Sequence, residues 1–175
     1  MRRPLSFACV LATVGALGAS AAPASALPPR GSVIFTVGAL NGLFDMHVEV
    51  QAVRSINLPA GTLLASGVDG DQRVMTNETL KLVPGQTASV QVFCIDPART
   101  MAQTGTHLHA IGPARGEIAA IFAAAGTATP EVLQRAIWVA RGDPRWAVGQ
   151  PEVAALLARA RVRSRRGHTV QVAID

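Results

Sequence analysis

Two short segments of this chain carry side chains that could react with each other. Residues 93–96 read Phe-Cys-Ile-Asp and place a thiol, Cys94, at the expected end of a strand. Residues 133–138 read Leu-Gln-Arg-Ala-Ile-Trp and place a carboxamide, Gln134, on an expected helix. A thiol is a nucleophile and a carboxamide carries an acyl carbon, so these residue types suit nucleophilic acyl chemistry, which needs a thiolate and a stabilised oxyanion.

The two segments resemble the two halves of the secreted bacterial thioester domains found on surface adhesins. In that family an aromatic-Cys-Ile-Asp/Glu motif supplies the thiol and a Gln-x-Ala-Ile-Trp motif supplies the amide. The resemblance covers residues 93–138 and implies that Cys94 attacks the amide carbon of Gln134, giving a bond that an amine on a partner can capture. It also implies supporting roles for the neighbouring motif residues, which are Phe93, Asp96, Ile137 and Trp138.

Cys94 also fits a simpler interpretation. The chain has two cysteines, and Cys9 lies in the N-terminal segment that we expect to be removed. The remaining cysteine has no intrachain partner, and a buried unpaired cysteine on a strand often packs as a small hydrophobe. On this interpretation the protein is a non-covalent β-sandwich module, for binding or structure, that binds a protein or polymer through loops such as residues 100–113.

A third, weaker hypothesis is an envelope metal-binding protein. His107 and His109 alternate with Leu108 in a segment that we expect to be an irregular loop. Histidine suits copper and zinc, yet the spacing fits no standard metal motif, so we assign no metal ligand and no cofactor. No Gly-x-Ser-x-Gly or phosphate-loop motif is present, and no acid–base pair stands out, so catalytic turnover is the least supported function.

The first 26 residues have the features of a cleavable secretory signal. Arg2 and Arg3 precede an apolar run that extends from Leu5 to about Ala19. Small residues Ala-Ser-Ala at positions 24–26 then provide a cleavage site. We therefore expect a secreted or periplasmic protein whose functional part is a single domain over residues 27–175, with no membrane span after removal of the signal.

The charge of this chain does not indicate a nucleic-acid partner. The sequence holds 16 Lys and Arg against 11 Asp and Glu; without Arg2 and Arg3 the balance is 14 − 11, or +3. Five arginines between positions 159 and 166 account for the excess, and no aromatic residues interleave with them. A solvated helix end explains this cluster, and we expect the partner to be a protein or a surface polymer.

Hydrophobic periodicity predicts strands in the first two-thirds of the domain. Apolar residues alternate with polar ones over residues 45–53 and again over residues 87–95, as in half-buried strands. Turn residues separate these from further short strands, which are expected at residues 32–37, 62–66 and, as one or two strands, 73–83. Such spacing indicates an antiparallel β-sandwich or an open barrel.

The remaining part of the domain is expected to be helical until its last strand. Helices are predicted at residues 116–125, 130–140 and 151–161, and the second begins with a Thr129 cap followed by proline. Residues 168–174 alternate again and would form a closing strand that pairs with the earlier ones. The fold class is therefore α+β, with about three helices inserted before a C-terminal strand.

Overall fold

The computed structural model describes residues 27–40 and 42–161. Six antiparallel strands form a closed barrel in the order β1-β2-β7-β5-β4-β8, and a small second sheet pairs β3 with β6. The fold class is α+β, as predicted, and the barrel is closed where the sequence left a sandwich or an open barrel. The strands are β1 (Val33–Leu40), β2 (Met46–Ala52), β3 (Ile56–Leu58), β4 (Thr62–Ser66), β5 (Val74–Thr76), β6 (Leu80–Leu82), β7 (Thr87–Cys94) and β8 (His107–Pro113).

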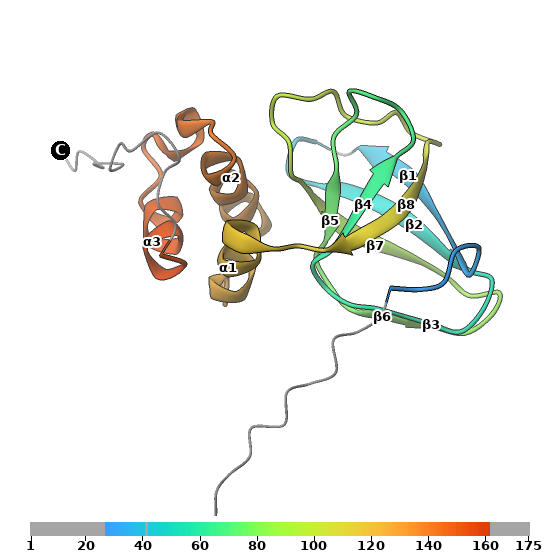
Figure 1. The fold of residues 1–175 in the computed structure, drawn as a ribbon. Coiled ribbons are helices and arrows are strands. Elements are labelled where there is room, and N and C mark those ends of the chain that lie inside the picture. The colour runs from blue at the N-terminus through green and yellow to red at the C-terminus, as the bar shows by residue number, and fades with distance from the viewer. Residues whose placement is uncertain (1–26, 41, 162–175) are drawn as a thin grey trace, which may run out of the picture.

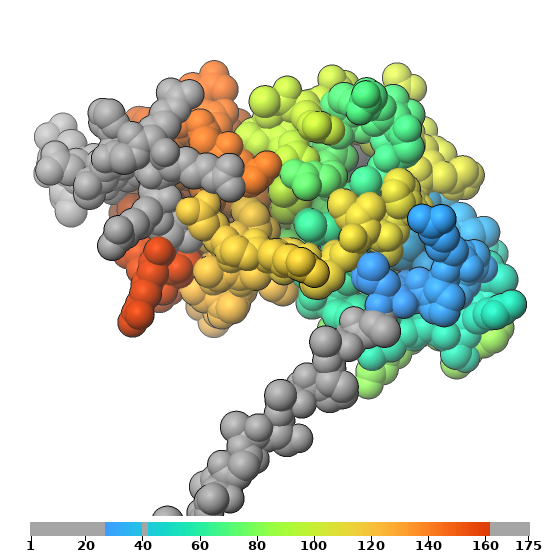
Figure 2. Space-filling model, in the orientation of Figure 1, coloured from blue at the N-terminus to red at the C-terminus, as the bar shows by residue number. Residues whose placement is uncertain are grey.

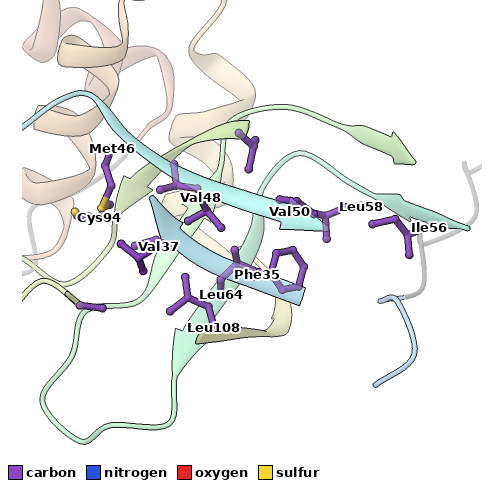
Figure 3. Close-up of a cluster of buried hydrophobic side chains, with 14 of the residues drawn as sticks. Phe35, Val37, Met46, Val48, Val50, Ile56, Leu58, Leu64, Cys94 and Leu108 are labelled. Atoms are coloured by element: carbon purple, nitrogen blue, oxygen red, sulfur yellow. The ribbon is translucent and has the colours of Figure 1, made fainter. Parts of the chain in front are cut away.

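The two strands with the clearest alternation form adjacent walls of the barrel. β2 and β7 pair antiparallel from Met46 with Val92 to Gln51 with Thr87. The inward side chains of β2 are buried, whereas His47, Glu49 and Gln51 are half-buried or exposed, as the period of two predicts. These inward residues form the barrel core together with side chains from the other strands, part of which Figure 3 shows.

The helices pack together against one side of the barrel (Figure 1). They are α1 (Gly116–Ala124), α2 (Pro130–Ala140) and α3 (Pro151–Arg159), with a short 3-10 helix, η1 (Pro144–Ala147), between the last two. α2 begins where its sequence predicts, because the Thr129 hydroxyl accepts a hydrogen bond from the Val132 N–H and Pro130 occupies the first helical position. A second apolar cluster fills the space between these helices and the outer face of the barrel.

The structure differs from the sequence prediction at two strands, β8 and β3. Residues 100–113 are not an irregular loop throughout, because residues 107–113 form β8. β8 pairs with β4 on one side and with β1 on the other, and so it closes the barrel. β3 was also missed, since three residues are too few to show alternation. The predicted closing strand at residues 168–174 lies outside the described residues, as does the predicted signal at residues 1–26.

The barrel and the helical layer form one continuous body in the space-filling view (Figure 2). The segment that follows β8 leads directly into α1, so the chain leaves the barrel at the side where the helices pack (Figure 1). None of the helices in residues 27–40 and 42–161 is long and apolar enough to cross a membrane. The end of β7 and the side of α2 meet at this junction, and they carry the two predicted reactive residues.

Candidate functional site

Cys94 and Gln134, 40 residues apart in the chain, are in direct contact. The backbone N–H of Cys94 donates a hydrogen bond of 2.8 Å to Oε1 of Gln134. Nε2 of Gln134 in turn donates a hydrogen bond of 2.8 Å to the backbone carbonyl of Cys94. Both residues are buried, with 1% and 2% of their surface exposed. The fold therefore brings together the thiol-bearing residue and the amide that the sequence singled out.

The backbone of β7 explains which way Cys94 directs its hydrogen-bonding groups. Successive residues of a strand turn their N–H and C=O to opposite neighbours. The N–H of Ile95 bonds to the carbonyl of Arg73, immediately before β5, at 2.9 Å. The N–H and C=O of Cys94 must therefore point the other way, toward the β2 side of β7.

On that side β2 begins too late to provide a partner. The β2–β7 ladder ends at the pair Met46 and Val92, so its continuation would place Phe44 opposite Cys94. Phe44 instead belongs to the turn before β2. Buried backbone groups must find other partners, and the carboxamide of Gln134 supplies one acceptor and one donor in the place of the missing strand residue.

The thiol of Cys94 projects into the end of the barrel core. Its side chain belongs to the cluster that contains Met46 and Val92, and Figure 3 places Cys94 and Met46 at the same end of this cluster. Burial, with a smaller contribution from the negative charge of Asp96, raises the pKa of Cys94 from 9.0 to about 12. At neutral pH the group is therefore a thiol and not a thiolate.

Asp96 connects the end of β7 to both neighbouring elements. Its carboxylate accepts two hydrogen bonds of 2.7 Å from Arg73 and one of 3.1 Å from Arg141, at the C-terminal end of α2. Burial alone would raise the pKa of Asp96, but hydrogen bonds and charge from Arg73, aided by Arg141, outweigh it and lower the pKa to about 2. Asp96 and Cys94 thus hold α2 at two points, Arg141 and Gln134, about two helical turns apart.

The other predicted supporting residues lie on two different sides of the site. Phe93 and Ile137 are buried together in the cluster between barrel and helices. Trp138 is buried in the barrel cluster with Cys94. Its indole Nε1 is buried without a hydrogen-bond partner among the described residues. Trp138 therefore covers the thiol side of the pair, whereas Phe93 and Ile137 fix the position of α2 on β7.

An aromatic cluster that was not predicted from the sequence surrounds Trp138. Trp146 lies 4.5 Å from Trp138 and Phe44 lies 6.0 Å from it, between ring centroids. The guanidinium of Arg135 lies over Phe44 and Trp146. The chain has two tryptophans and no tyrosine, and their placement eight residues apart was the available signal. Nothing local indicated that Phe44, from the first hairpin, would join them.

His107 and His109 both lie on the outer, exposed face of β8, because the segment is extended. Nδ1 of His107 lies 3.3 Å from the hydroxyl of Thr36. Within residues 27–40 and 42–161, no group of three or more potential His, Cys, Asp or Glu ligands gathers in one place. The two histidines therefore have no third ligand of these types in the described part of the chain.

Comparison with known proteins adds no relative. No protein-family model, no curated protein and no solved structure matches this chain. The geometry of the Cys94–Gln134 pair is therefore the observation that bears on function.

Proposed function

We propose that this protein is an exported bacterial module that forms an internal thioester between Cys94 and Gln134 and uses it to attach covalently to amine-bearing partners. The observation that carries the proposal is the pair of 2.8 Å hydrogen bonds that hold the Gln134 carboxamide against the backbone of Cys94. The predicted secretory signal at residues 1–26 supports a role outside the cytoplasm. The partner is a protein or a surface polymer that presents a primary amine.

The two hydrogen bonds hold the Gln134 amide against the backbone of the residue that carries the thiol. Strand side chains stand roughly perpendicular to the plane of their own N–H and C=O groups. The amide of Gln134 is bonded to these groups, so the sulfur of Cys94 leaves the backbone out of the plane in which the amide is held. A nucleophile approaches a carbonyl carbon from outside its plane. The arrangement favours formation of the Sγ–Cδ bond.

The same hydrogen bonds suit the charges that develop during the reaction. The N–H of Cys94 already donates to Oε1 of Gln134, the atom that becomes the oxyanion, at a distance typical of oxyanion holes. The carbonyl of Cys94 accepts from Nε2, the atom that leaves. The Sγ–Cδ bond forms, the Cδ–Nε2 bond breaks, and the thiol proton goes to Nε2, so that ammonia departs and a thioester remains.

The raised pKa of Cys94 makes this step slow and burial protects its product. With a pKa of about 12, the thiol must lose its proton during the attack, because little thiolate exists beforehand. Asp96 does not accept this proton, since its pKa is about 2 and two arginines hold its carboxylate. Once formed, the thioester is buried as Cys94 and Gln134 are, and water is kept from it until an amine enters.

Intact-mass measurement tests the proposal. The full-length gene is expressed in a bacterium and the exported product is purified. A thioester lowers its mass by about 17 Da relative to the sequence, and methylamine then converts it to a form about 14 Da above the sequence mass with one free thiol. Cys94→Ala and Gln134→Ala serve as controls and should show neither change. An unmodified mass with a free, slowly titrating thiol contradicts the proposal.

One observation favours a second candidate, a non-covalent module with an inert cysteine. The Gln134 amide satisfies both backbone groups at the end of the β2–β7 ladder, so it has a structural use without any reaction. This candidate predicts that Cys94→Ser leaves partner binding unchanged and that the exported protein has its unmodified mass. The mass measurement therefore separates the two functions in one experiment.

A further inference from the structure

Arg135 covers an aromatic surface beside the Cys94–Gln134 pair. Its guanidinium carbon lies 4.9 Å from the ring centroid of Phe44 and 5.2 Å from that of Trp146. The Phe44 and Trp146 rings stand nearly perpendicular, with an interplanar angle of 88° and centroids 6.1 Å apart. Two ring faces set at a right angle around one cation form the walls of a cation–π site.

The aromatic surface is continuous with the proposed reactive pair. Trp138 follows Gln134 by one helical turn and contacts both Phe44 and Trp146. Phe44 occupies the turn that the β2–β7 register directs toward Cys94. A small molecule bound between these rings would lie at the side of the site where the strand ladder stops.

Two acidic groups contact the residues of the same surface. Glu131 accepts hydrogen bonds of 2.9 and 2.7 Å from Arg135 and is half exposed. Asp143 accepts a hydrogen bond of 3.1 Å from Nε1 of Trp146. The same carboxylate also accepts hydrogen bonds of 2.8 Å from Nε and Nη2 of Arg145. If Arg135 moved away, Glu131 would lose its ion pair and the ring faces would lose their cation, so the vacated space would attract another positive group.

We propose that Phe44 and Trp146 form a binding site for an alkylammonium group beside the Cys94–Gln134 pair, and that Arg135 occupies this site until such a group displaces it. The use of this site in capture of a partner amine rests on the proposed thioester function. The site itself does not, because it consists of the rings and their charged rim.

The elements that carry the site allow Arg135 to leave. Arg135 is partly buried, with 19% of its side chain exposed, and its long side chain can leave the rings by rotation about its own bonds without a change in the helix backbone. Phe44 and Trp146 belong to a turn and to the short helix η1, whereas Gln134 and Cys94 belong to regular elements. Exchange of one cation for another therefore requires only side-chain motion at the surface.

The test uses tetramethylammonium, a cation that has no N–H and cannot react with a thioester. The exported full-length protein and its Arg135→Met variant are titrated, and binding is followed through the two indole N–H signals, assigned with Trp146→Phe. Removal of the competing guanidinium should tighten tetramethylammonium binding about tenfold or more. tert-Butanol, which is of similar size and uncharged, should bind neither protein measurably. Arg135→Gln is a second variant in case the methionine variant does not fold.

Arg145→Met is the matched control, because it removes the same charge from an 85% exposed arginine that pairs with Asp143 and not with the rings. The site would be overturned if Arg145→Met bound tetramethylammonium as tightly as Arg135→Met does, or if tert-butanol bound as tightly as tetramethylammonium. It would also be overturned if neither Arg135 variant bound tetramethylammonium. Methylamine capture should also be about tenfold faster in Arg135→Met. An unmodified mass of the wild-type protein refutes the thioester but not the cation site. If Arg135→Met carries the thioester and captures methylamine at the wild-type rate, the cation site has no role in the capture reaction.

Discussion

Replacing Gln134 by glutamate turns the docked amide into a pH-dependent group of nearly the same shape. A protonated carboxyl can accept from the Cys94 N–H and donate to the Cys94 carbonyl, which reproduces both 2.8 Å hydrogen bonds. An ionised carboxylate has no donor, so one of its oxygens would face the carbonyl in a buried site. Cys94→Ala is the reference background, because it keeps the backbone groups and cannot form a thioester.

The sign of the pH effect follows from the folded pKa. Burial and the facing carbonyl both disfavour the carboxylate, so the pKa of the new glutamate in the folded protein lies above its unfolded value of about 4.3. The folded state then binds the proton more tightly than the unfolded state. Stability is fully present below the unfolded pKa and is lost as the pH rises through the folded pKa.

The structure also sets the size of the loss. A buried donor or acceptor left unsatisfied costs about 1–3 kcal/mol, and more for a charged group, so the glutamate variant should lose at least about 1–3 kcal/mol between about pH 4 and pH 7.5. Gln134→Ala, which removes both hydrogen bonds, should lose about 2–6 kcal/mol at either pH. Urea denaturation of both variants against Cys94→Ala at the two pH values measures these differences. If the glutamate variant matched the reference at both pH values, the amide would not be docked on Cys94 as described.

Two further predictions concern the titrating groups around the pair. In protein that retains a free Cys94 thiol, burial raises the pKa of Cys94 from 9.0 to about 12. The free energy of unfolding should therefore fall by about 1.4 kcal/mol per pH unit above about pH 9, because the unfolded state loses this proton first. Urea denaturation at alkaline pH measures the fall, which Cys94→Ala should not show. A free-thiol protein with the same alkaline profile as Cys94→Ala would contradict the burial of the sulfur. Asp96→Asn breaks the pairs with Arg73 and Arg141 and should cost about 1–3 kcal/mol at neutral pH, less than a fully buried pair because both arginines are partly exposed. Its deficit relative to wild type should shrink as the pH falls from 3.8 toward 2, where wild-type Asp96 protonates, and a deficit independent of pH would count against the charge pairing.

The two strongest alternations in the sequence correspond to strands, because the period of two is a local property of the chain. Residues 46–52 and 87–94 show it clearly, and both form barrel walls. Proline after a Thr129 cap likewise predicted the start of α2 from adjacent residues. β8 was missed because its sequence, His-Leu-His-Ala-Ile-Gly-Pro, alternates only over its first four residues and then ends in glycine and proline. Its role in the fold is to pair with two strands that are distant in the sequence.

In the candidate site, too, the residue types could be predicted from the sequence, whereas the contacts between them depend on the tertiary fold. The resemblance of residues 93–96 and 133–138 to two short motifs singled out Cys94 and Gln134 as a thiol and acyl pair, because a nucleophile and a carboxamide are properties of single side chains. Their contact depends on where β2 stops relative to β7, which leaves the backbone groups of Cys94 for a side chain 40 residues away. The aromatic site of Phe44 and Trp146 arises from the same junction, because unpaired backbone and apolar surface at the end of a sheet must be covered by whatever the tertiary fold brings there.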